Sequence, residues 1–328
     1  MADPRAARAR AHSNIALIKY WGKREASLNL PAVGSLSITL DALFTDTHVH
    51  FDPALAQDRL ALNDAAEQVA PDRFVQFLDE VRRRAGLSTR ARIHTRNNFP
   101  TAAGLASSAS GFAALALAAS HAAGLALSLR ELSVLARQGS GSAARSIFGG
   151  FVHMHRGDRD DGLDAFAEPV DPPQPWPLQM AIGIVDTAAK KTGSTDGMRD
   201  SAGRAPYYSA WVESASTDLT HALAAVAQRD FTRLGELTEH SCLKMHGLML
   251  ATPPGLIYWQ PATLAALHAV RELRGQGTEA YCTIDAGPQI KVLHRAGDTA
   301  AVQACLDSVP GVREVRLSGL GPAARLLD

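Results

Sequence analysis

The run PTAAGLASSASG, residues 100–111, leads into an alanine-rich segment that ends near His121. Gly104 permits a backbone turn that a Cβ atom would hinder. Because Ala and Leu dominate the following residues, the sequence predicts a helix that begins near Ala106 and ends before Gly124. The first N–H groups of such a helix have no intrahelical partner and lie at its positive end, which suits a phosphate. The stretch alone fits equally well a phosphate site or a tightly packed helix entry without a ligand.

Composition and charge exclude several classes of partner. The 328 residues are 46% hydrophobic and 20% charged, as in a soluble globular protein, and they suffice for two domains. Lys plus Arg number 33, as do Asp plus Glu, so no net charge favours nucleic acid or an anionic membrane. We therefore expect no nucleic acid and no membrane as partners. An anionic partner must be small and held by a local cluster of cations.

The cysteines and the apolar segments indicate a cytoplasmic protein. Cys242, Cys282 and Cys305 are widely spaced, which favours reduced thiols over a disulfide framework or a zinc site. The N-terminus has no apolar core of the kind that marks a signal peptide. The apolar segment 111–129 is rich in Ala and interrupted by polar residues, so we expect a buried helix there.

A dense cluster of cations follows the first predicted strand. The apolar run 15–18 predicts a buried strand, and the sequence KYWGKR, residues 19–24, follows at once. Three cations and two aromatic rings within six residues favour an anion site over a solvated strand end.

Three further segments carry chemistry-bearing residues. The run GSGSAAR, residues 139–145, predicts a second small-residue loop; it follows a predicted helix, which argues against a dinucleotide-binding loop. Arg145 in this loop is either a residue that binds a carboxylate through a two-pronged hydrogen bond or an ordinary arginine on a helix surface. The loop 188–195 contains Lys190 and Lys191, as a phosphate-facing or a merely exposed loop would. Asp285 ends a predicted strand before Gly and Pro, where a turn former is as common as a catalytic acid.

The sequence also predicts a domain boundary and the positions of the main strands and helices. The sequence DPPQPWP at 171–177 predicts a boundary between domains 1–177 and 178–328. Alternation and apolar spacing predict strands at 35–40, 47–51, 91–95, 151–155 and 180–185, and helices at 71–84, 128–138, 207–228, 231–249 and 262–274. Walker A, HExxH and GxSxG motifs are absent from the sequence. The remaining motifs suit phosphoryl transfer from ATP to a small anion, in which the protein mainly positions groups and neutralises charge.

Six segments resemble one known family. Residues 100–109 resemble the phosphate loop of the GHMP small-molecule kinases, and residues 14–24 narrow the resemblance to the mevalonate diphosphate decarboxylases. Segments 139–146, 194–198, 245–246 and 285–288 match the same family in the same order. The resemblance implies an α+β fold, the GHMP kinase fold, with an N-terminal domain like ribosomal protein S5 domain 2, a ferredoxin-like C-terminal domain, and the site between them.

The resemblance also implies a reaction. ATP with Mg²⁺ phosphorylates the 3-hydroxyl of mevalonate 5-diphosphate, and loss of this phosphate and of CO₂ gives isopentenyl diphosphate in the mevalonate pathway. The protein would then be an ATP-dependent carboxy-lyase with a small anionic substrate. The residues leave open a decarboxylase of mevalonate 5-phosphate or 3,5-bisphosphate, a GHMP kinase without decarboxylation, and a noncatalytic relative. We further expect a homodimer, for which the sequence has no specific signal.

Each matching residue acquires an expected role from the resemblance. Asp285 is expected at the 3-hydroxyl as base or orienting group, with Lys19 close by, and Arg145 at the C1 carboxylate. The expected substrate-binding residues are Asn14, Tyr20, Lys23, Ser140, Gly141 and Arg145. The expected ATP-binding residues are Ala103, Gly104, Leu105, Ala106, Ser107, Ser108 and Lys190 or Lys191. Either serine would suit Mg²⁺, and Ser108 is our prediction.

Overall fold

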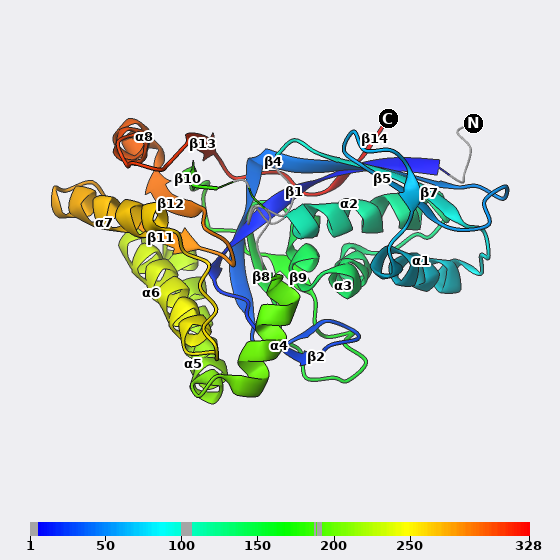
Figure 1. The fold of residues 1–328 in the computed structure, drawn as a ribbon, viewed down its shortest axis with the longest axis horizontal. Helices are drawn as coiled ribbons and strands as arrows, with labels where there is room; N and C mark the ends of the chain where they lie inside the picture. Colours follow the sequence, from blue (N-terminus) through cyan, green and yellow to red (C-terminus); the bar gives the residue numbers. More distant parts are fainter. Residues whose placement is uncertain (1–5, 100–106, 187, 189–191) are drawn as a thin grey trace.

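The computed structural model describes residues 6–99, 107–186, 188 and 192–328. A large sheet with strand order β14-β1-β4-β7-β5-β6 forms one side of the molecule, and β8 and β9 extend it from β4 (Figure 1). Its pairs are antiparallel except for β5 with β7. The strands are β1 (Ala6–Ile18), β4 (Ser35–Phe51), β5 (Arg59–Leu62), β6 (Gln68–Val69), β7 (Ala91–Asn97), β8 (Phe151–Met154), β9 (Ala167–Pro169) and β14 (Arg325–Leu327).

A second, antiparallel sheet has the order β11-β12-β10-β13. Its strands are β10 (Leu178–Ile184), β11 (Ala280–Ile284), β12 (Ile290–Arg295) and β13 (Glu314–Ser318). A short hairpin of β2 (Lys23–Glu25) and β3 (Leu30–Pro31) lies apart from both sheets. The chain then returns to its beginning, because the last strand, β14, pairs with β1.

Helices α1 (Asp72–Ala85), α2 (Ser107–Ala122) and α3 (Leu129–Gly139) and the 3₁₀ helix η1 (Gly141–Ile147) cover one face of the large sheet. Most of α2 is buried, and the small side chains of its alanines let the helix lie close to β1 and β4. The buried helix predicted within residues 111–129 is therefore confirmed as far as Ala122, where α2 ends.

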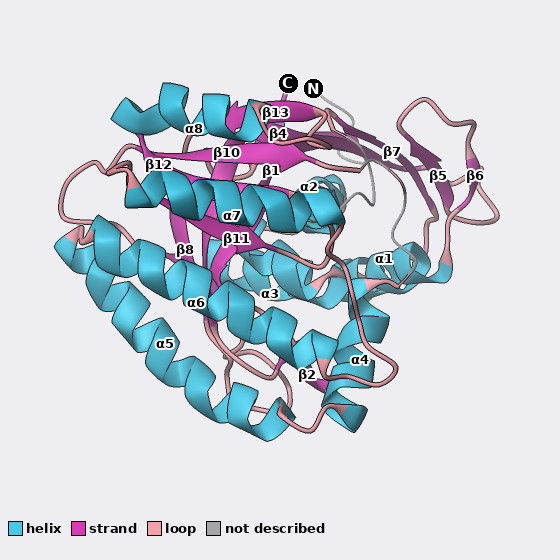
Figure 2. Cartoon of the chain, turned by 60° about the vertical axis from the view of Figure 1, so that its left-hand side comes forward, coloured by secondary structure: helices cyan, strands magenta, loops and turns pink. Residues whose placement is uncertain are grey.

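The remaining helices are α4 (Ser194–Arg204), α5 (Tyr208–Gln228), α6 (Phe231–Leu250), α7 (Pro261–Gly275), α8 (Thr299–Asp307) and the short η2 (Ala296–Asp298). Figure 2 shows α6, α7 and α8 against the second sheet and α5 beside α6. Residues of β1, β4, β10, α5 and α6 share one apolar cluster, so the two sheets are joined by a common core. Within the described residues, no helix combines the length and the apolar character needed to cross a bilayer.

The structure confirms most predicted elements and changes two. The helix predicted at 128–138 is α3, and it begins with a capping box in which Ser128 and Glu131 are bonded reciprocally. The two strands predicted at 35–40 and 47–51 form one continuous strand, β4, which pairs with β1 along most of its length. The loop predicted at 139–145 is instead largely the 3₁₀ helix η1, because small side chains allow this tight winding against α2 and α3.

Candidate active site

One cavity of about 830 Å³ opens where the C-terminal end of β1, the start of α2, η1 and the end of β11 meet. Ten residues singled out from the sequence line it: Asn14, Lys19, Tyr20, Lys23, Ser107, Ser108, Ser140, Gly141, Arg145 and Asp285. Segments far apart in the chain therefore place their polar groups around a single space. Ala103 to Ala106, Lys190 and Lys191 lie outside the described residues.

Asp285 is held between two buried lysines at the end of β11. Its Oδ1 lies 2.6 Å from Nζ of Lys19, and its Oδ2 lies 3.0 Å from Nζ of Lys291. Burial favours the neutral carboxyl group, but the two ammonium groups outweigh it and hold the pKa of Asp285 below its ordinary value. The Asp285 side chain is 27% exposed, whereas both lysines are fully buried. The three groups carry one net positive charge, which favours an anion in the cavity.

Helix α6 fixes the two strand ends that carry this ion pair. The backbone N–H of Lys19 donates to Oγ of Ser241 at 3.0 Å. The N–H of Ile284, next to Asp285, donates to Sγ of Cys242 at 3.1 Å, and Nε2 of His246 lies 3.2 Å from the carbonyl oxygen of Ile284. Burial lowers the pKa of His246 to about 3, so this imidazole is neutral near pH 7. A single helix thus sets the distance between a residue of the first sheet and one of the second.

Arg145 is buried beneath the same cavity with its guanidinium group oriented by two partners. Its Nε donates to Oδ1 of Asn14 at 3.0 Å, and one terminal nitrogen donates to Oγ of Ser35 at 2.8 Å. The amide of Asn14 is in turn fixed by donating to Oγ of Ser146 at 2.8 Å. Burial lowers the pKa of Arg145 to about 10, with Tyr20 and Asp285 opposing the shift, so the group stays cationic near pH 7.

Tyr20 packs directly on the backbone of Gly141. A Cβ atom built on Gly141 would lie 2.2 Å from the phenol oxygen, so only glycine fits here. Burial raises the pKa of Tyr20 to about 12, against the influence of Arg145 and Arg137, and keeps the hydroxyl protonated. This hydroxyl is buried and has no hydrogen-bond partner within the described structure.

Further polar atoms without a partner gather on the same side of the molecule. Among the described residues, most buried side-chain nitrogen and oxygen atoms without a hydrogen bond belong to Tyr20, Arg24, Arg137 and Gln138. Buried polar groups are normally satisfied, and a cluster of exceptions is typical of a site that binds a polar ligand. Tyr20 and Gln138 line the cavity itself.

Two further cations complete the wall of the cavity. Burial lowers the pKa of Lys23, and the nearby Arg73 lowers it further. Arg73 donates from two nitrogens to the carbonyl oxygen of Gly139, at 3.0 and 2.8 Å. Across the cavity, Oγ of Ser140 lies 3.4 Å from Oγ of Ser108 at the start of α2.

Sequence reasoning missed three cations of this region: Arg73, Arg137 and Lys291. A lysine inside the apolar strand 290–294 is a signal that could have found Lys291, because an unpaired charge there would be costly. Arg73 and Arg137 lie on predicted helices and resemble ordinary surface residues in the sequence. Arg73 lines the cavity, Arg137 lies behind it, and Lys291 supports Asp285 from within the second sheet.

The arrangement can hold two anionic groups and act on a hydroxyl between them. Lys23, Tyr20 and the Gly139–Ser142 backbone offer one anion site, and the N-terminus of α2 with Ser107 and Ser108 offers a second. Arg145 offers a fork for a carboxylate, and Asp285 is an ionised acceptor at the same cavity.

The chain is similar to known proteins over nearly its whole length. Residues 11–167 match the family model of the diphosphomevalonate decarboxylase-like N-terminal domain, and residues 180–316 match that of the mevalonate 5-diphosphate decarboxylase C-terminal domain. The diphosphomevalonate decarboxylase of Gibberella zeae is 37% identical over 325 residues, which cover 92% of this chain and 85% of that protein.

Two solved structures superpose closely. The mevalonate diphosphate decarboxylase of Staphylococcus aureus has a TM-score of 0.93 at 36% identity and covers 99% of this chain and 98% of its own. A complex of the protein MDDEF with MVAPP, AMPPCP and magnesium has a TM-score of 0.90 at 40% identity, with coverages of 98% and 99%.

Proposed function

The chain belongs to the diphosphomevalonate decarboxylase family, and from this membership we propose that the cavity between β1, η1, α2 and β11 is its active site. The observation that carries the proposal is the position of Asp285. Its carboxylate lies between Lys19 and Lys291 and faces the cavity that Arg145 and Ser108 also line.

The enzyme catalyses the ATP-dependent decarboxylation of mevalonate 5-diphosphate to isopentenyl diphosphate. Its α+β architecture is the GHMP kinase fold expected from the sequence. ATP is the co-substrate and Mg²⁺ accompanies it. The reaction forms ADP, inorganic phosphate and CO₂. The steps that release these products are assigned below to groups in the cavity.

We assign the first step, transfer of the γ-phosphoryl group to the 3-hydroxyl, to Asp285. Its carboxylate orients the hydroxyl and accepts the proton as the new O–P bond forms and the bond to ADP breaks. The low pKa makes Asp285 a weak base, which is sufficient because a dissociative phosphoryl transfer leaves the attacking oxygen little changed. Lys19 keeps the carboxylate ionised and in position.

We assign the second step, the fragmentation, to Arg145 and Asn14. The guanidinium group holds the C1 carboxylate so that the C1–C2 bond aligns with the departing 3-phosphate. The C3–O bond breaks as phosphate leaves, the C1–C2 bond breaks as CO₂ leaves, and its electron pair forms the C2–C3 double bond. Ser35 and Asn14 pre-organise the Arg145 fork, which limits the reorganisation that the step requires.

The 5-diphosphate is proposed to bind against Tyr20, Lys23, Ser140 and Gly141. The unpartnered Tyr20 hydroxyl can donate to a phosphate oxygen, and Lys23 supplies charge. The lack of a side chain at Gly141 lets the Tyr20 hydroxyl lie close to η1, in the wall of the same cavity.

The phosphates of ATP are proposed to bind at the start of α2, and Lys190 is assigned to the same site from the sequence alone. The hydroxyl groups of Ser107 and Ser108 are oxygen donors of the kind that Mg²⁺ prefers, and Ser108 would hold the ion. Mg²⁺ supplies positive charge to the phosphate oxygens when bound. Ala103 to Ala106 are assigned to the same site from the sequence alone.

Three further expectations remain proposals. We propose two domains, 1–177 and 178–328, which the separate matches of the two family models support. We also propose that the enzyme acts as a homodimer and in the cytoplasm, the latter supported by three cysteines that are all free.

A substrate panel tests the proposed function. Mevalonate, its 5-phosphate and its 5-diphosphate are each incubated with ATP and Mg²⁺, and ADP and CO₂ are measured. Equal amounts of ADP and CO₂ from the 5-diphosphate, with little turnover of the other two, are expected. ADP formation without CO₂ would favour a kinase, and preference for the 5-phosphate would reassign the Tyr20–Lys23 site.

A further inference from the structure

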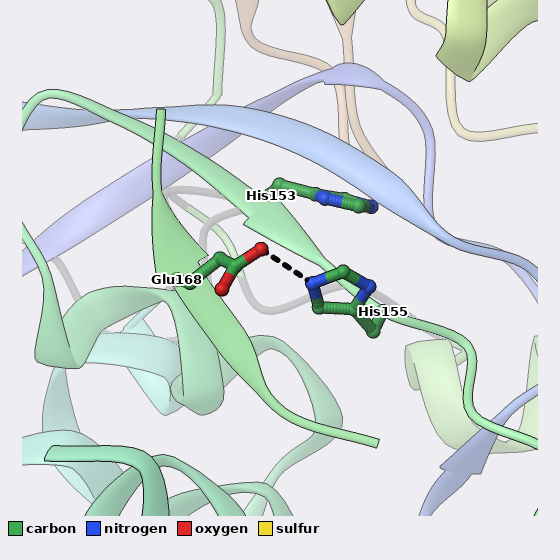
Figure 3. A group of neighbouring side chains, drawn as sticks. All are labelled: His153, His155 and Glu168. Carbon is green, nitrogen blue, oxygen red and sulfur yellow. Dashed lines mark hydrogen bonds and ion pairs between the residues drawn. The ribbon is translucent and has the colours of Figure 1, made fainter. Parts of the chain in front are cut away.

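His153, His155 and Glu168 form a compact group at the edge of the large sheet, away from the catalytic cavity (Figure 3). One potential ligand atom from each residue lies within 4.8 Å of the other two. The imidazole rings have centroids 4.0 Å apart, and Nε2 of His155 lies 2.7 Å from Oε1 of Glu168. None of these residues lines the cavity.

The register of two strands produces this grouping. His153 and His155 are two residues apart on an extended segment, so their side chains point to the same face. The N–H of His155 donates to the carbonyl oxygen of Phe166 at 2.9 Å, so the pairing of β8 with β9 continues past Met154. Glu168 lies directly opposite His153 in this pairing. The three side chains are therefore positioned by backbone hydrogen bonds rather than by a flexible loop.

We propose that His153, His155 and Glu168 bind one divalent transition-metal ion, with Zn²⁺ as the best fit. Two imidazole nitrogens and one carboxylate oxygen are a donor set that zinc proteins use, with the fourth position left to water. Zinc–ligand bonds of about 2.0–2.2 Å place neighbouring ligand atoms about 3.4 Å apart. Small side-chain rotations would bring the three atoms to that spacing, and the His155–Glu168 hydrogen bond would open.

The surroundings favour a nitrogen-preferring ion over Mg²⁺. Mg²⁺ requires oxygen ligands and retains its waters, so it does not compete for a site with two imidazoles. The magnesium that accompanies ATP would therefore not displace zinc from this site.

The site lies on the opposite face of the sheet from Arg145. Phe151 precedes His153 by two residues and packs on Trp176, whereas Val152 and Met154 belong to the core beneath α2. On β4, Leu36 belongs to the same cluster as Phe151, so the neighbouring Ser35, which accepts a hydrogen bond from Arg145, points to the opposite face. A bound ion would join the edge strand β9 to β8 without contacting the catalytic residues, so we expect it to stabilise the fold and leave turnover unchanged.

Metal titration of the chelator-treated full-length protein tests the proposal. Zn²⁺ alone is titrated by calorimetry, and Co²⁺ is used as a visible probe of four-coordinate geometry. One ion per chain is expected, with a rise in the melting temperature and no displacement by millimolar Mg²⁺. His155→Gln and Glu168→Gln should each weaken binding at least tenfold and abolish the thermal shift. Turnover equal to that of the parent protein would show that these variants are folded.

Two matched variants locate the ion. His48→Gln alters another histidine pair of the same sheet, His48 with His94, and should leave zinc binding intact. Cys305→Ser removes a partly exposed thiol and should also leave it intact. No saturable binding, binding unaffected by both His155→Gln and Glu168→Gln, or loss of binding in Cys305→Ser would overturn the proposal.

Discussion

The ammonium group of Lys19 and the carboxylate of Asp285 meet at 2.6 Å, although 265 residues of chain separate them along the sequence and they end strands of different sheets. The same ammonium group donates to the carbonyl oxygen of Ala16 at 2.9 Å, and helix α6 is bonded to both strand ends. The pair is therefore held by the fold before any substrate binds, which is the condition for electrostatic pre-organisation.

Asp285→Asn should lower turnover strongly and preserve binding. The amide keeps the size of the carboxyl group but can neither accept the proton nor pair with Lys19 and Lys291 as an anion. Loss of a general base or orienting anion lowers rates by about 10²–10⁴-fold. We expect kcat to fall by this amount, with KM for mevalonate 5-diphosphate within a few-fold of the parent value in a coupled ADP assay. Asp307→Asn, at an exposed site on α8, should behave as the parent protein. Full activity of Asp285→Asn would refute the assigned role.

Lys291→Met should move the acid limb of the pH–rate profile to higher pH. Lys19 and Lys291 together depress the pKa of Asp285, so removing one cation raises it. A depressed carboxyl pKa adds stability that is present above the ordinary value of about 3.9 and is lost as pH falls. The variant should lose part of that stability near pH 7 and lose activity at a higher pH than the parent enzyme. Measured kcat between pH 4 and 8 checks this.

Lys244→Met is the matched control for Lys291→Met. Lys244 also pairs with an aspartate, Asp218, but the pair is partly buried between α5 and α6 and lies away from Asp285. Its loss should leave the pH–rate profile in place. An acid limb that shifts equally in both variants would mean that general charge, rather than the contact with Asp285, sets the profile.

Gly141→Ala should weaken substrate binding by displacing Tyr20. The new Cβ atom would lie 2.2 Å from the phenol oxygen, in a buried site where the ring has little room to move. A tenfold rise in KM, equivalent to about 1.4 kcal/mol, is expected. Gly203→Ala on α4 has no atom within 4 Å of the new Cβ and should leave KM unchanged while stabilising the helix by about 0.5–1 kcal/mol. If Gly141→Ala and Gly203→Ala had the same KM, the steric mechanism would be excluded.

How much of this structure the sequence could predict depends on the range of the interaction involved. The capping box of α3 and the alanine-rich α2 were predictable because their signals lie within a few residues. The continuity of β4 was not, since residues 44–46 gain their strand conformation from pairing with β1 and β7, and residues 40–43 span a register shift in the pairing with β1. The winding of η1 likewise results from packing on α2 and α3 rather than from its own composition.

The site shows the same dependence. Lys19, Arg145 and Asp285 could be proposed from motifs, and the structure places all three at one cavity. The lysine in strand β12 could be noticed in the sequence, but its contact with Asp285 could not be predicted, because that contact exists only once β11 and β12 pair with Thr283 opposite Lys291. The burial of Arg137 could not be predicted either, since a helix of ordinary pattern contains it and only the tertiary fold covers it.

Arg137→Met should raise stability and weaken substrate binding. The Arg137 side chain is fully buried, and within the described structure its three guanidinium nitrogens have no hydrogen-bond partner. Burial lowers its pKa to about 10, a direct sign of the unfavourable desolvation of the cation. Replacing an unsatisfied buried polar group by an apolar one of similar length removes a cost of about 1–3 kcal/mol.

The charge of Arg137 is retained, in our interpretation, because it favours an anion beside Tyr20. Loss of the charge should therefore raise KM for the 5-diphosphate while thermal unfolding shows a higher melting temperature. Arg82→Met is the matched control, because Arg82 is equally buried but is paired with Asp58 and Asp79. Without Arg82, the buried carboxylate of Asp58 keeps only the more distant Arg90, 3.5 Å away, as a cationic partner, and breaking a buried pair costs about 3–5 kcal/mol. The two variants should thus shift the melting temperature in opposite directions, and a fall of similar size in both would show that Arg137 contributes to stability and not to anion binding.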